Sequence, residues 1–363
     1  MTTAPGRVVF AGGGTGGTVG PGVAIAERLR ELDPSLEIRF VVSDRPVDRL
    51  LLEPGDWAFD PTPARSPSIR PAAAWRFVRG WRATRRITAS RFGDPARARV
   101  VALGGFVAPP VVAAAVRRGV PVDLLNLDAV AGRANRWIAS RATRVFTAVE
   151  TDLDLAAAPV GVPLRRAVLA TRSPADARLG LGLDASRPTL LVTGASQGAR
   201  SIDRFLTDLL ADHPAIFNGW QVVHLAGGDV ESLSRAYADA GVPATVRPFL
   251  DEMGLAWSAA DLVVSRGGAS SVAEIAASRT PAIILPYPWH KDRHQARNAS
   301  TLEAAGAVTV LDDPVEGEVA ADRVRSTLGE LLAEPARLEA MRSAFPATPE
   351  DPAEVIARAI LEA

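Results

Sequence analysis

The sequence has no cysteine and no excess charge of either sign among its 363 residues. The missing thiols exclude a disulfide framework, thiol catalysis and thiolate metal sites. The 41 basic and 41 acidic residues cancel, so we do not expect a protein that binds nucleic acid through an overall positive charge. No apolar run reaches the roughly 20 residues that a membrane helix needs, and none has the form of a signal-peptide core. We therefore expect a soluble protein whose partner sites are local.

The pattern of apolar residues predicts two α/β halves. At 363 residues the chain is too long for one ordinary domain. Short β-branched runs alternate with longer helical patterns, which is typical of parallel sheets with helices on both faces. A Gly/Pro-containing stretch at 159–163 joins the two halves, and the acidic tail from residue 312 predicts helices with solvated faces. The expected strands are 7–11, 37–42, 100–103, 122–125 and 144–148, then 189–193, 221–226, 245–248, 261–265, 282–285 and 308–311.

The first expected strand runs into a glycine-rich loop at 12–17, and Pro21 follows where a helical pattern begins. Glycine lets backbone N–H groups approach a ligand closely, and the start of a helix favours a polar or anionic group. Three of the glycines also match the dinucleotide fingerprint, with Asp44 after the second strand as a possible ribose partner. The loop therefore predicts a ligand site, and a tight turn without a ligand is the alternative.

Two more turns from a strand into a helix lie in the second half, at 194–200 and 265–271. Both place hydroxyl groups and backbone N–H groups at the start of a helix, the first with Ser196 and the second with Ser270 and Ser271. Two such turns in one half suit a diphosphate better than a single phosphate. The alternative for Ser270 and Ser271 is that they only cap the helix.

Taken together, these motifs resemble those of the MurG-like GT-B glycosyltransferases. The resemblance rests on 12–17 with Pro21, Gly104-Gly105-Phe106, 194–200, 265–269 with Glu274, and 290–295 with Asn298, which occur here in the family's order. It covers most of the chain and implies an α/β protein with two Rossmann-like domains facing across a cleft. Residues 1–163 would form the domain that binds the acceptor and faces the membrane, with a final helix at 344–363 packing back on it. Residues 164–343 would bind the UDP-sugar.

The activity that this resemblance implies is inverting transfer of N-acetylglucosamine from UDP-N-acetylglucosamine to lipid I. Lipid I is undecaprenyl-pyrophosphoryl-N-acetylmuramyl-pentapeptide, and the product is lipid II of peptidoglycan synthesis. The resemblance implies a peripheral enzyme at the cytoplasmic face of the cell membrane, with no cofactor, no metal and no nucleic-acid partner. The binding residues that it implies are Thr15, Gly16, Gly17, Asn135, Arg165, Ser196, Leu250, Ser270, Ser271, Glu274 and Gln295.

The roles implied for five of these residues agree with the chemistry of their side chains. Arg165 and Ser196 would meet the nucleotide and its diphosphate, and a guanidinium group suits phosphate. Leu250 would border the uracil through its backbone, and Glu274 would accept hydrogen bonds from the ribose hydroxyls. Gln295 would meet the sugar. The resemblance therefore implies a donor site built mainly in the second half.

The departures from the family lie mostly on the acceptor side. Thr18 stands at the catalytic position where the family usually has a histidine, Phe106 stands where it has a tyrosine, and His294 replaces a glutamine. The family's His-Glu-Gln-Asn stretch is 125–128 here and ends in Asp128. Threonine cannot take the proton of the acceptor hydroxyl, so we take Asp128, just after the expected strand 122–125, as the candidate base. The alternative is that Asp128 is a helix N-cap or a turn residue.

Three other functions stay open at this point: a UDP-sugar transferase with another acceptor, a silent UDP-sugar-binding protein, and an NAD-dependent oxidoreductase. Two short patterns also resemble metal sites, His290 and His294 around Asp292, and Asp152-Leu153-Asp154. Patterns this short arise often by chance, and GT-B enzymes generally do not depend on a metal. We therefore predict no metal.

The segment 65–91 departs most from the neutral average of the chain. From 62 to 91 there are eight arginines and no acidic residue, with Trp75, Val78 and Trp81 spaced three apart. A basic amphipathic helix of this kind is typical of an anchor on an anionic membrane surface. The alternative is a helix packed on the core with a solvated arginine face. No nucleic-acid recognition motif is present.

Overall fold

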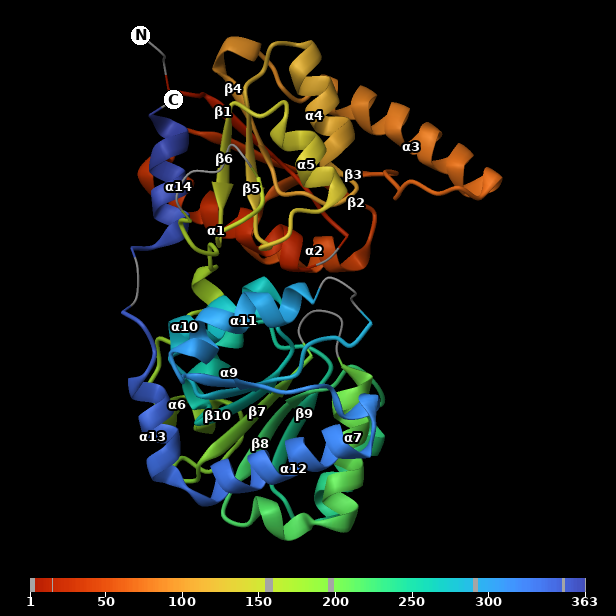
Figure 1. Cartoon of the computed structure of the whole chain (residues 1–363). Helices are drawn as coiled ribbons and strands as arrows, with labels where there is room; N and C mark the ends of the chain where they lie inside the picture. Colours follow the sequence, from red (N-terminus) through yellow and green to blue (C-terminus); the bar gives the residue numbers. More distant parts are fainter. Residues whose placement is uncertain are drawn as a thin grey trace. The chain divides into compact units, whose positions relative to one another are not determined.

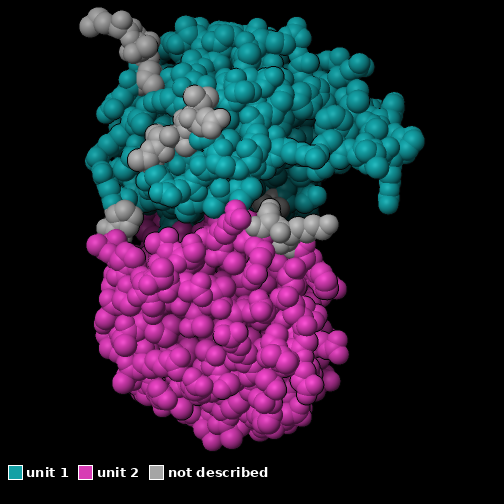
Figure 2. All heavy atoms as spheres, in the orientation of Figure 1, with its two compact units in different colours: residues 1–165, 349–363 teal, residues 166–348 magenta. Residues whose placement is uncertain are grey.

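Two parallel six-stranded sheets carry the fold, one in each of two structural units. The computed structural model describes residues 4–14, 16–153, 159–194, 199–289, 293–347 and 350–362. Unit 1 consists of Met1–Arg165 with Pro349–Ala363, and unit 2 consists of Arg166–Thr348 (Figure 2). Among the described residues, no helix has both the length and the apolar character needed to cross a membrane.

The sheet of unit 1 has the strand order β3-β2-β1-β4-β5-β6. The chain runs outward from β1 to β3 and then returns to β4 beside β1, so the order reverses between β1 and β4 (Figure 1). Helix α14 packs on α1 and brings the C-terminal segment to this unit. The strands are β1 (Arg7–Ala11), β2 (Glu37–Ser43), β3 (Ala58–Thr62), β4 (Ala98–Ala102), β5 (Val122–Asn126) and β6 (Arg144–Thr147), and the helices are α1 (Gly16–Leu32), α2 (Pro46–Leu52), α3 (Pro71–Ala89), α4 (Ala108–Arg117), α5 (Arg133–Ala139) and α14 (Pro352–Leu361).

Two local features of unit 1 differ from the sequence analysis. Strand β3 was not expected, because Asp60 and Pro61 interrupt the β-branched pattern that marks the other strands. It lies at the edge of the sheet, where a residue without a backbone N–H is tolerated. Helix α1 begins at Gly16, so Pro21 lies inside the helix and not in its first turn. Proline there removes the hydrogen bond that the carbonyl of Gly17 would otherwise accept.

A buried ion cluster joins three neighbouring strands of unit 1. Asp123 of β5 is fully buried and accepts hydrogen bonds from Arg99 of β4 at 3.2 Å and from Arg144 of β6 at 2.6 Å. A buried carboxylate needs such partners, because removing one side of a buried ion pair costs about 3–5 kcal/mol. The cluster therefore ties β4, β5 and β6 together in the half of the sheet that holds the candidate base.

The sheet of unit 2 repeats the same topology, with the order β12-β11-β10-β7-β8-β9. Here the order reverses between β7 and β10. The strands are β7 (Thr189–Thr193), β8 (Gln221–Leu225), β9 (Ala244–Arg247), β10 (Leu262–Ser265), β11 (Ala282–Ile284) and β12 (Val308–Val310), and the helices are α6 (Pro174–Gly180), α7 (Arg200–Asp212), α8 (Val230–Asp239), α9 (Met253–Ala259), α10 (Ala269–Ser278), α11 (His294–Ala304), α12 (Glu318–Ala333) and α13 (Pro335–Ser343).

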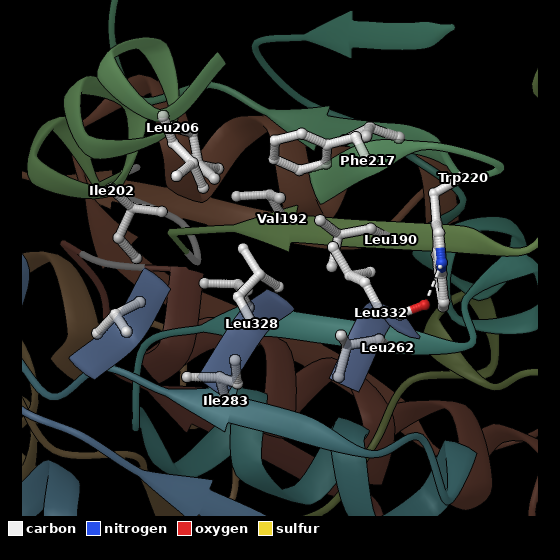
Figure 3. Packing of buried hydrophobic residues seen from close by; sticks show 14 of the residues in the cluster. Leu190, Val192, Ile202, Leu206, Phe217, Trp220, Leu262, Ile283, Leu328 and Leu332 are labelled. Carbon is white, nitrogen blue, oxygen red and sulfur yellow. Dashed lines mark hydrogen bonds between the residues drawn. The ribbon is translucent and has the colours of Figure 1, made fainter. Parts of the chain in front are cut away.

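Apolar side chains from strands and helices fill the space between the sheet of unit 2 and its covering helices. Leu190 of β7 and Leu262 of β10 meet Leu328 of α12 in one cluster (Figure 3). Trp220 packs at its border and donates a hydrogen bond from Nε1 to the carbonyl of Leu332 at 2.9 Å. Strands buried on both faces explain the continuous apolar runs of the sequence. The prediction of two doubly wound α/β halves is confirmed.

Candidate functional site

The strongest candidate site in unit 2 lies where β7 and β10 end side by side. Ligands of doubly wound sheets bind at the carboxyl ends of the strands where the strand order reverses. The turn after β10, residues 266–268, leads directly into α10. Of the turn after β7, residues 195–198 lie outside the described part of the chain, and the predicted Ser196 lies among them.

The start of α10 is arranged for an anion. Gly268 is the N-cap residue, and within the described part of the chain no side-chain hydrogen bond caps the helix. The backbone N–H groups of the first turn therefore have no partner within the helix. Ser270 and Ser271 are the second and third residues of α10, so the interpretation of these serines as N-caps is wrong. Their position places two hydroxyl groups beside the N–H groups and the positive end of the helix dipole.

Glu274 lies one turn further along α10, on the same face as Ser270 and Ser271 because residues three and four apart are neighbours on a helix. Its Oε2 atom accepts a hydrogen bond of 2.8 Å from Nε1 of Trp257, which is almost fully buried in α9. The indole thus fixes the orientation of a partly exposed carboxylate. A carboxylate held in this way can accept hydrogen bonds from a diol.

The first turn of α11 closes on the same loop. A Cβ atom on Gly267 would lie 2.3 Å from the carbonyl oxygen of Gln295, so only glycine allows this approach. Asn298 donates from Nδ2 to the carbonyl of Gly267 at 3.1 Å. The Oε1 atom of Gln295 accepts from the backbone N–H of Tyr287 at 2.8 Å. The structure therefore brings the backbone of Gln295 next to Gly267, just before α10, and its contact with the sugar stays a prediction.

A buried ion pair that the sequence analysis missed holds this edge of the sheet together. Arg266, directly after β10, pairs with Asp313, and both side chains are buried. Arg266 also donates to the carbonyl of Leu285 at 2.8 Å and to the hydroxyl of Ser201 in α7 at 2.6 Å. These contacts join the ends of β10 and β11 to the first turn of α7. They fix the two helix starts of the candidate site relative to each other.

Two further residues were implied for nucleotide binding, Leu250 in unit 2 and Arg165 in unit 1. Leu250 is 7% exposed and packs in an apolar cluster with Trp257, so its side chain belongs to the core. Its backbone role stays a prediction. Arg165 is the last residue of unit 1 in the chain's first segment. A Cβ atom on Gly20 of α1 would lie 3.9 Å from its Nε atom.

In unit 1 the glycine loop after β1 is held by a carboxylate that the sequence analysis did not identify. Asp48 of α2 is fully buried, and its two oxygens accept from the backbone N–H of Gly14 at 3.0 and 2.9 Å. The same carboxylate accepts from the backbone N–H of Ser43 at 3.0 Å. Gly13 has a φ of 149°, and a Cβ atom there would lie 2.5 Å from Asp48 Oδ2. The N–H of Gly14 is therefore bound within the protein.

These contacts contradict the dinucleotide interpretation of the loop. In that interpretation the glycine N–H groups would receive a pyrophosphate and Asp44 would receive a ribose. Asp44 instead pairs with Arg65 at 2.7 Å, and the hydrogen bonds from Arg65 hold the pKa of the Asp44 carboxyl below its usual value. The loop is a packed junction, with Thr15 outside the described residues and Gly16 and Gly17 in the first turn of α1.

Two of the departures from the family, Thr18 and Phe106, lie at this junction. A Cβ atom on Gly14 would lie 2.6 Å from the ring of Phe106, and one on Gly12 would lie 3.1 Å from the methyl group of Thr18. Arg45 donates to the carbonyl of Gly14 at 2.8 Å, and its guanidinium carbon is 5.3 Å from the centre of the Phe106 ring. Both departures thus lie next to the carboxyl ends of β1 and β4.

The candidate base lies beyond the end of the neighbouring strand β5. Asp128 is partly buried in a bend, and α5 begins five residues later with Gly132 as its N-cap. Asp128 is therefore not a helix N-cap. It does lie in a bend between β5 and α5, as the other form of that alternative expected. Asn126 donates to the backbone carbonyl of Asp128 at 2.8 Å and accepts from Asn135 at 2.9 Å. Within the described residues, the Asp128 carboxylate makes no hydrogen bond and no ion pair.

The metal-like patterns gain no support from the geometry. His290, Asp292 and Asp154 lie outside the described residues. Asp152 pairs with Arg136, and the hydrogen bond from the backbone N–H of Ala131 contributes most to lowering its pKa. Across the described ranges, no group of three His, Asp or Glu side chains is arranged to hold a metal ion.

Helix α3 divides the aromatic residues of the arginine-rich segment into two groups. Trp75 and Val78 are 61% and 44% exposed. Trp81 is partly buried, and its ring centre lies 6.1 Å from that of Trp137 in α5. In Figure 1 the N-terminal half of α3 extends away from the rest of unit 1, while its C-terminal half lies beside α4. The three residues therefore do not form one exposed stripe.

Known proteins match both halves of the chain. The N-terminal domain of glycosyltransferase family 28 matches residues 8–147, and its C-terminal domain matches residues 189–356. A protein from a Nocardioides species, named UDP-N-acetylglucosamine--N-acetylmuramyl-(pentapeptide) pyrophosphoryl-undecaprenol N-acetylglucosamine transferase, is 34% identical over 98% of each chain. A Mycobacterium leprae protein of the same name is 37% identical over 94% of this chain and 84% of its own. The crystal structure of Acinetobacter baumannii MurG, 24% identical, superposes with a TM-score of 0.71 over 99% of this chain and 100% of its own. The chain therefore belongs to glycosyltransferase family 28 and has the GT-B fold of MurG.

Proposed function

We propose that this protein transfers N-acetylglucosamine from UDP-N-acetylglucosamine to lipid I, releasing UDP and forming lipid II. The observation that carries this function is full-length similarity to transferases of that name, with both halves of the chain matching one glycosyltransferase family. The oxidoreductase alternative is set aside, because the family is different and the glycine loop is bound by Asp48. We assign the reaction to the cytoplasmic face of the cell membrane, because the proposed acceptor is lipid-linked.

The geometry of unit 2 supports the proposal that this unit binds the donor, UDP-N-acetylglucosamine. In the reaction, the bond from the anomeric carbon to the diphosphate oxygen breaks, and negative charge develops on the leaving UDP. The uncapped start of α10, with Ser270 and Ser271, offers N–H and hydroxyl donors to that charge. Glu274, oriented by Trp257, accepts from the ribose hydroxyls. Gln295 at the start of α11 meets the sugar.

On the acceptor side, the attacking hydroxyl must lose its proton as its oxygen bonds to the anomeric carbon from the face opposite the leaving UDP. We assign the base to Asp128, whose carboxylate makes no hydrogen bond or ion pair to any described residue. It lies at the carboxyl end of the sheet in unit 1, after β5. Thr18, at the position of the family's histidine, can orient the acceptor through its hydroxyl and cannot serve as the base.

Donor binding tests this assignment directly. Calorimetry on the full chain should show saturable binding of UDP-N-acetylglucosamine and of UDP, and no binding of NADH at the same concentrations. The nucleotide and diphosphate contacts proposed above are shared by UDP and its sugar, so UDP alone should retain most of the affinity. Tight NADH binding without UDP binding would contradict the proposed function.

The attachment of the enzyme to the membrane is a separate part of the proposal. Trp75, Val78 and Ile69 are exposed near the N-terminal end of α3, and Arg76 and Arg79 are exposed beside them. Exposed aromatic and aliphatic side chains next to arginines suit the boundary between lipid headgroups and acyl chains. We assign this end of α3 as the anchor on the anionic inner-membrane surface.

A further inference from the structure

Asn126 is a buried amide at the carboxyl end of β5, two residues before the candidate base Asp128. Its backbone is fixed in the sheet, because it lies opposite Thr147 of β6 and its carbonyl accepts from the backbone N–H of Ala148 at 2.9 Å. An amide side chain carries two donor hydrogens and an acceptor oxygen, and leaving them unpaired when buried would destabilise the protein. The partners of this side chain therefore show which segments it holds.

The Asn126 side chain uses its donors and its acceptor on three different segments. Its Nδ2 atom donates to the backbone carbonyl of Asp128 at 2.8 Å and to the hydroxyl of Thr151, which follows β6, at 3.3 Å. Its Oδ1 atom accepts from Nδ2 of Asn135, in the first turn of α5, at 2.9 Å. One buried side chain thus joins the bend after β5, the start of α5 and the segment after β6.

The loop after β4 closes on the same group of side chains. Gly104 has a φ of 87°, and a Cβ atom there would lie 2.6 Å from Oδ1 of Asn135. Only glycine combines this backbone conformation with so close an approach. Phe106 follows two residues later. The hydrogen bonds of Asn126 and Asn135 therefore connect the loop that carries Phe106 with the bend that carries Asp128.

The bend after β5 has two anchors, and neither of them is the Asp128 side chain. Leu127 packs, partly buried, against the apolar cluster that includes residues of α1 and α14. Asn126 holds the next carbonyl, that of Asp128. Because the Asp128 carboxylate makes no hydrogen bond or ion pair to any described residue, its direction depends on its own backbone. A catalytic group must stay within about 0.5 Å of its productive place, and a misplacement of about 1 Å can lower the rate by about 10²-fold.

We propose that Asn126 is a positioning residue for the transfer reaction. It fixes the backbone of Asp128, so that the carboxylate stays within reach of the acceptor hydroxyl. This inference rests on the proposed function, in which Asp128 is the base. In the family's His-Glu-Gln-Asn stretch a glutamate stands where this chain has Asn126, and an ionised carboxylate cannot donate to a carbonyl. The anchor therefore belongs to the residues of this chain and not to the family's motif.

A double-mutant cycle tests whether Asn126 acts through Asp128. Asn126→Leu removes the three hydrogen bonds at similar volume, and kcat should fall by about 10- to 10²-fold, while UDP-N-acetylglucosamine affinity stays within twofold. Added to Asp128→Asn, the same change should lower kcat by less than a further twofold, because the group it positions is already gone. The matched control is Gln221→Leu, which removes a buried amide bound to the carbonyls of Asp184 and Arg187 in unit 2 and should leave kcat within twofold.

A spin label measures the anchor without any acceptor. The chain has no cysteine, so Asp128→Cys takes a single nitroxide, whose rotational correlation time should fall at least twofold when Asn126→Leu is added and stay the same with Gln221→Leu. Asn126→Ala removes the same hydrogen bonds without the added methyl groups and serves if the leucine substitution disturbs folding.

Unchanged label mobility overturns the proposal, as do losses of kcat that multiply in the double variant. A wild type that transfers nothing to lipid I contradicts the proposed function instead, and the label still decides whether Asn126 holds the bend.

Discussion

The carboxylates of Asp48, Glu274 and Asp128 differ in burial and in hydrogen-bond partners. These differences indicate which of them can contact a substrate. Asp48 is fully buried and accepts from backbone N–H groups, so it is committed to holding the glycine loop. Glu274 is partly exposed and held on one side by Trp257, which orients it for a ligand. Asp128 is partly buried, and its carboxylate has no partner among the described residues. Only the last two have the exposure that contact with a substrate requires.

The first prediction concerns Glu274. Glu274→Gln keeps the size of the side chain and an oxygen that can accept from Trp257, but it removes the negative charge. We expect UDP affinity to fall by about 1–3 kcal/mol, because a hydrogen bond to a charged group is lost. Calorimetry with UDP measures this. Glu318→Gln, at the exposed start of α12, is the control and should leave the dissociation constant unchanged. Unchanged affinity in the Glu274 variant would remove this residue from the donor site.

The second prediction concerns the base. Asp128→Asn preserves size and hydrogen-bonding capacity while removing the proton acceptor. The turnover rate should therefore fall by about 10²- to 10⁴-fold, while the affinity for UDP-N-acetylglucosamine stays the same. Steady-state transfer rates and donor calorimetry on one preparation separate the two effects. Asp239→Asn, at the exposed end of α8, is the matched control. Turnover within a few-fold of wild type would mean that Asp128 is structural.

What the sequence could not reveal at this scale is which distant residues meet. Gly14 and Asp48 are 34 residues apart, and Arg266 and Asp313 are 47 apart. The residues next to Asp48 and Asp313 in the sequence do not indicate that either acid binds a distant loop. A sequence does not show whether a carboxylate is buried or exposed. The glycines at 12–17 indicated that another group approaches the loop backbone closely. The group that does so in the structure is the side chain of Asp48, not a ligand.

At the scale of single elements, runs of consecutive apolar residues predicted most of the strands. Parallel strands that are buried on both faces have such runs in their sequence. The exception, β3, contains Asp60 and Pro61, which only an edge strand tolerates. Helix α3 shows the limit of periodicity. Trp75 and Trp81 are equivalent in a helical pattern, yet only Trp81 meets Trp137 from another helix. Which aromatic face is covered depends on packing between elements.

The third prediction concerns α3. Trp75→Ala with Val78→Ala should reduce sedimentation with anionic vesicles, because these side chains are exposed and can insert into the membrane surface. Raised salt should weaken what remains, since screening reduces the attraction of the arginines. Trp81→Ala should instead lower the melting temperature through the lost contact with Trp137. Leu179→Ala with Val319→Ala, two exposed apolar residues of unit 2, is the control. Absence of vesicle binding by the wild type at low salt would contradict the anchor.

At the scale of the whole molecule, the two units repeat one topology with different chemistry at the point where the strand order reverses. In unit 1, Asp48 accepts a hydrogen bond from the glycine loop at this point, and the ring of Phe106 packs against the same loop. In unit 2, helix α10 follows β10 on one side of this point and carries two hydroxyl groups, those of Ser270 and Ser271, in its first turn. The fold alone does not decide between these roles, because one fold hosts many reactions. Our proposal that unit 2 binds the donor therefore rests on the side chains at each site and not on the fold.

The most direct test of the proposed function is a transfer assay with radiolabelled UDP-N-acetylglucosamine and the full chain. Lipid I is offered in parallel with other polyprenyl-linked glycans. We predict label in lipid II with equimolar release of UDP, and label in the other glycans at no more than the background of a reaction without enzyme. Label transferred to a different glycan and not to lipid I, or donor binding without any turnover of lipid I, would contradict the account.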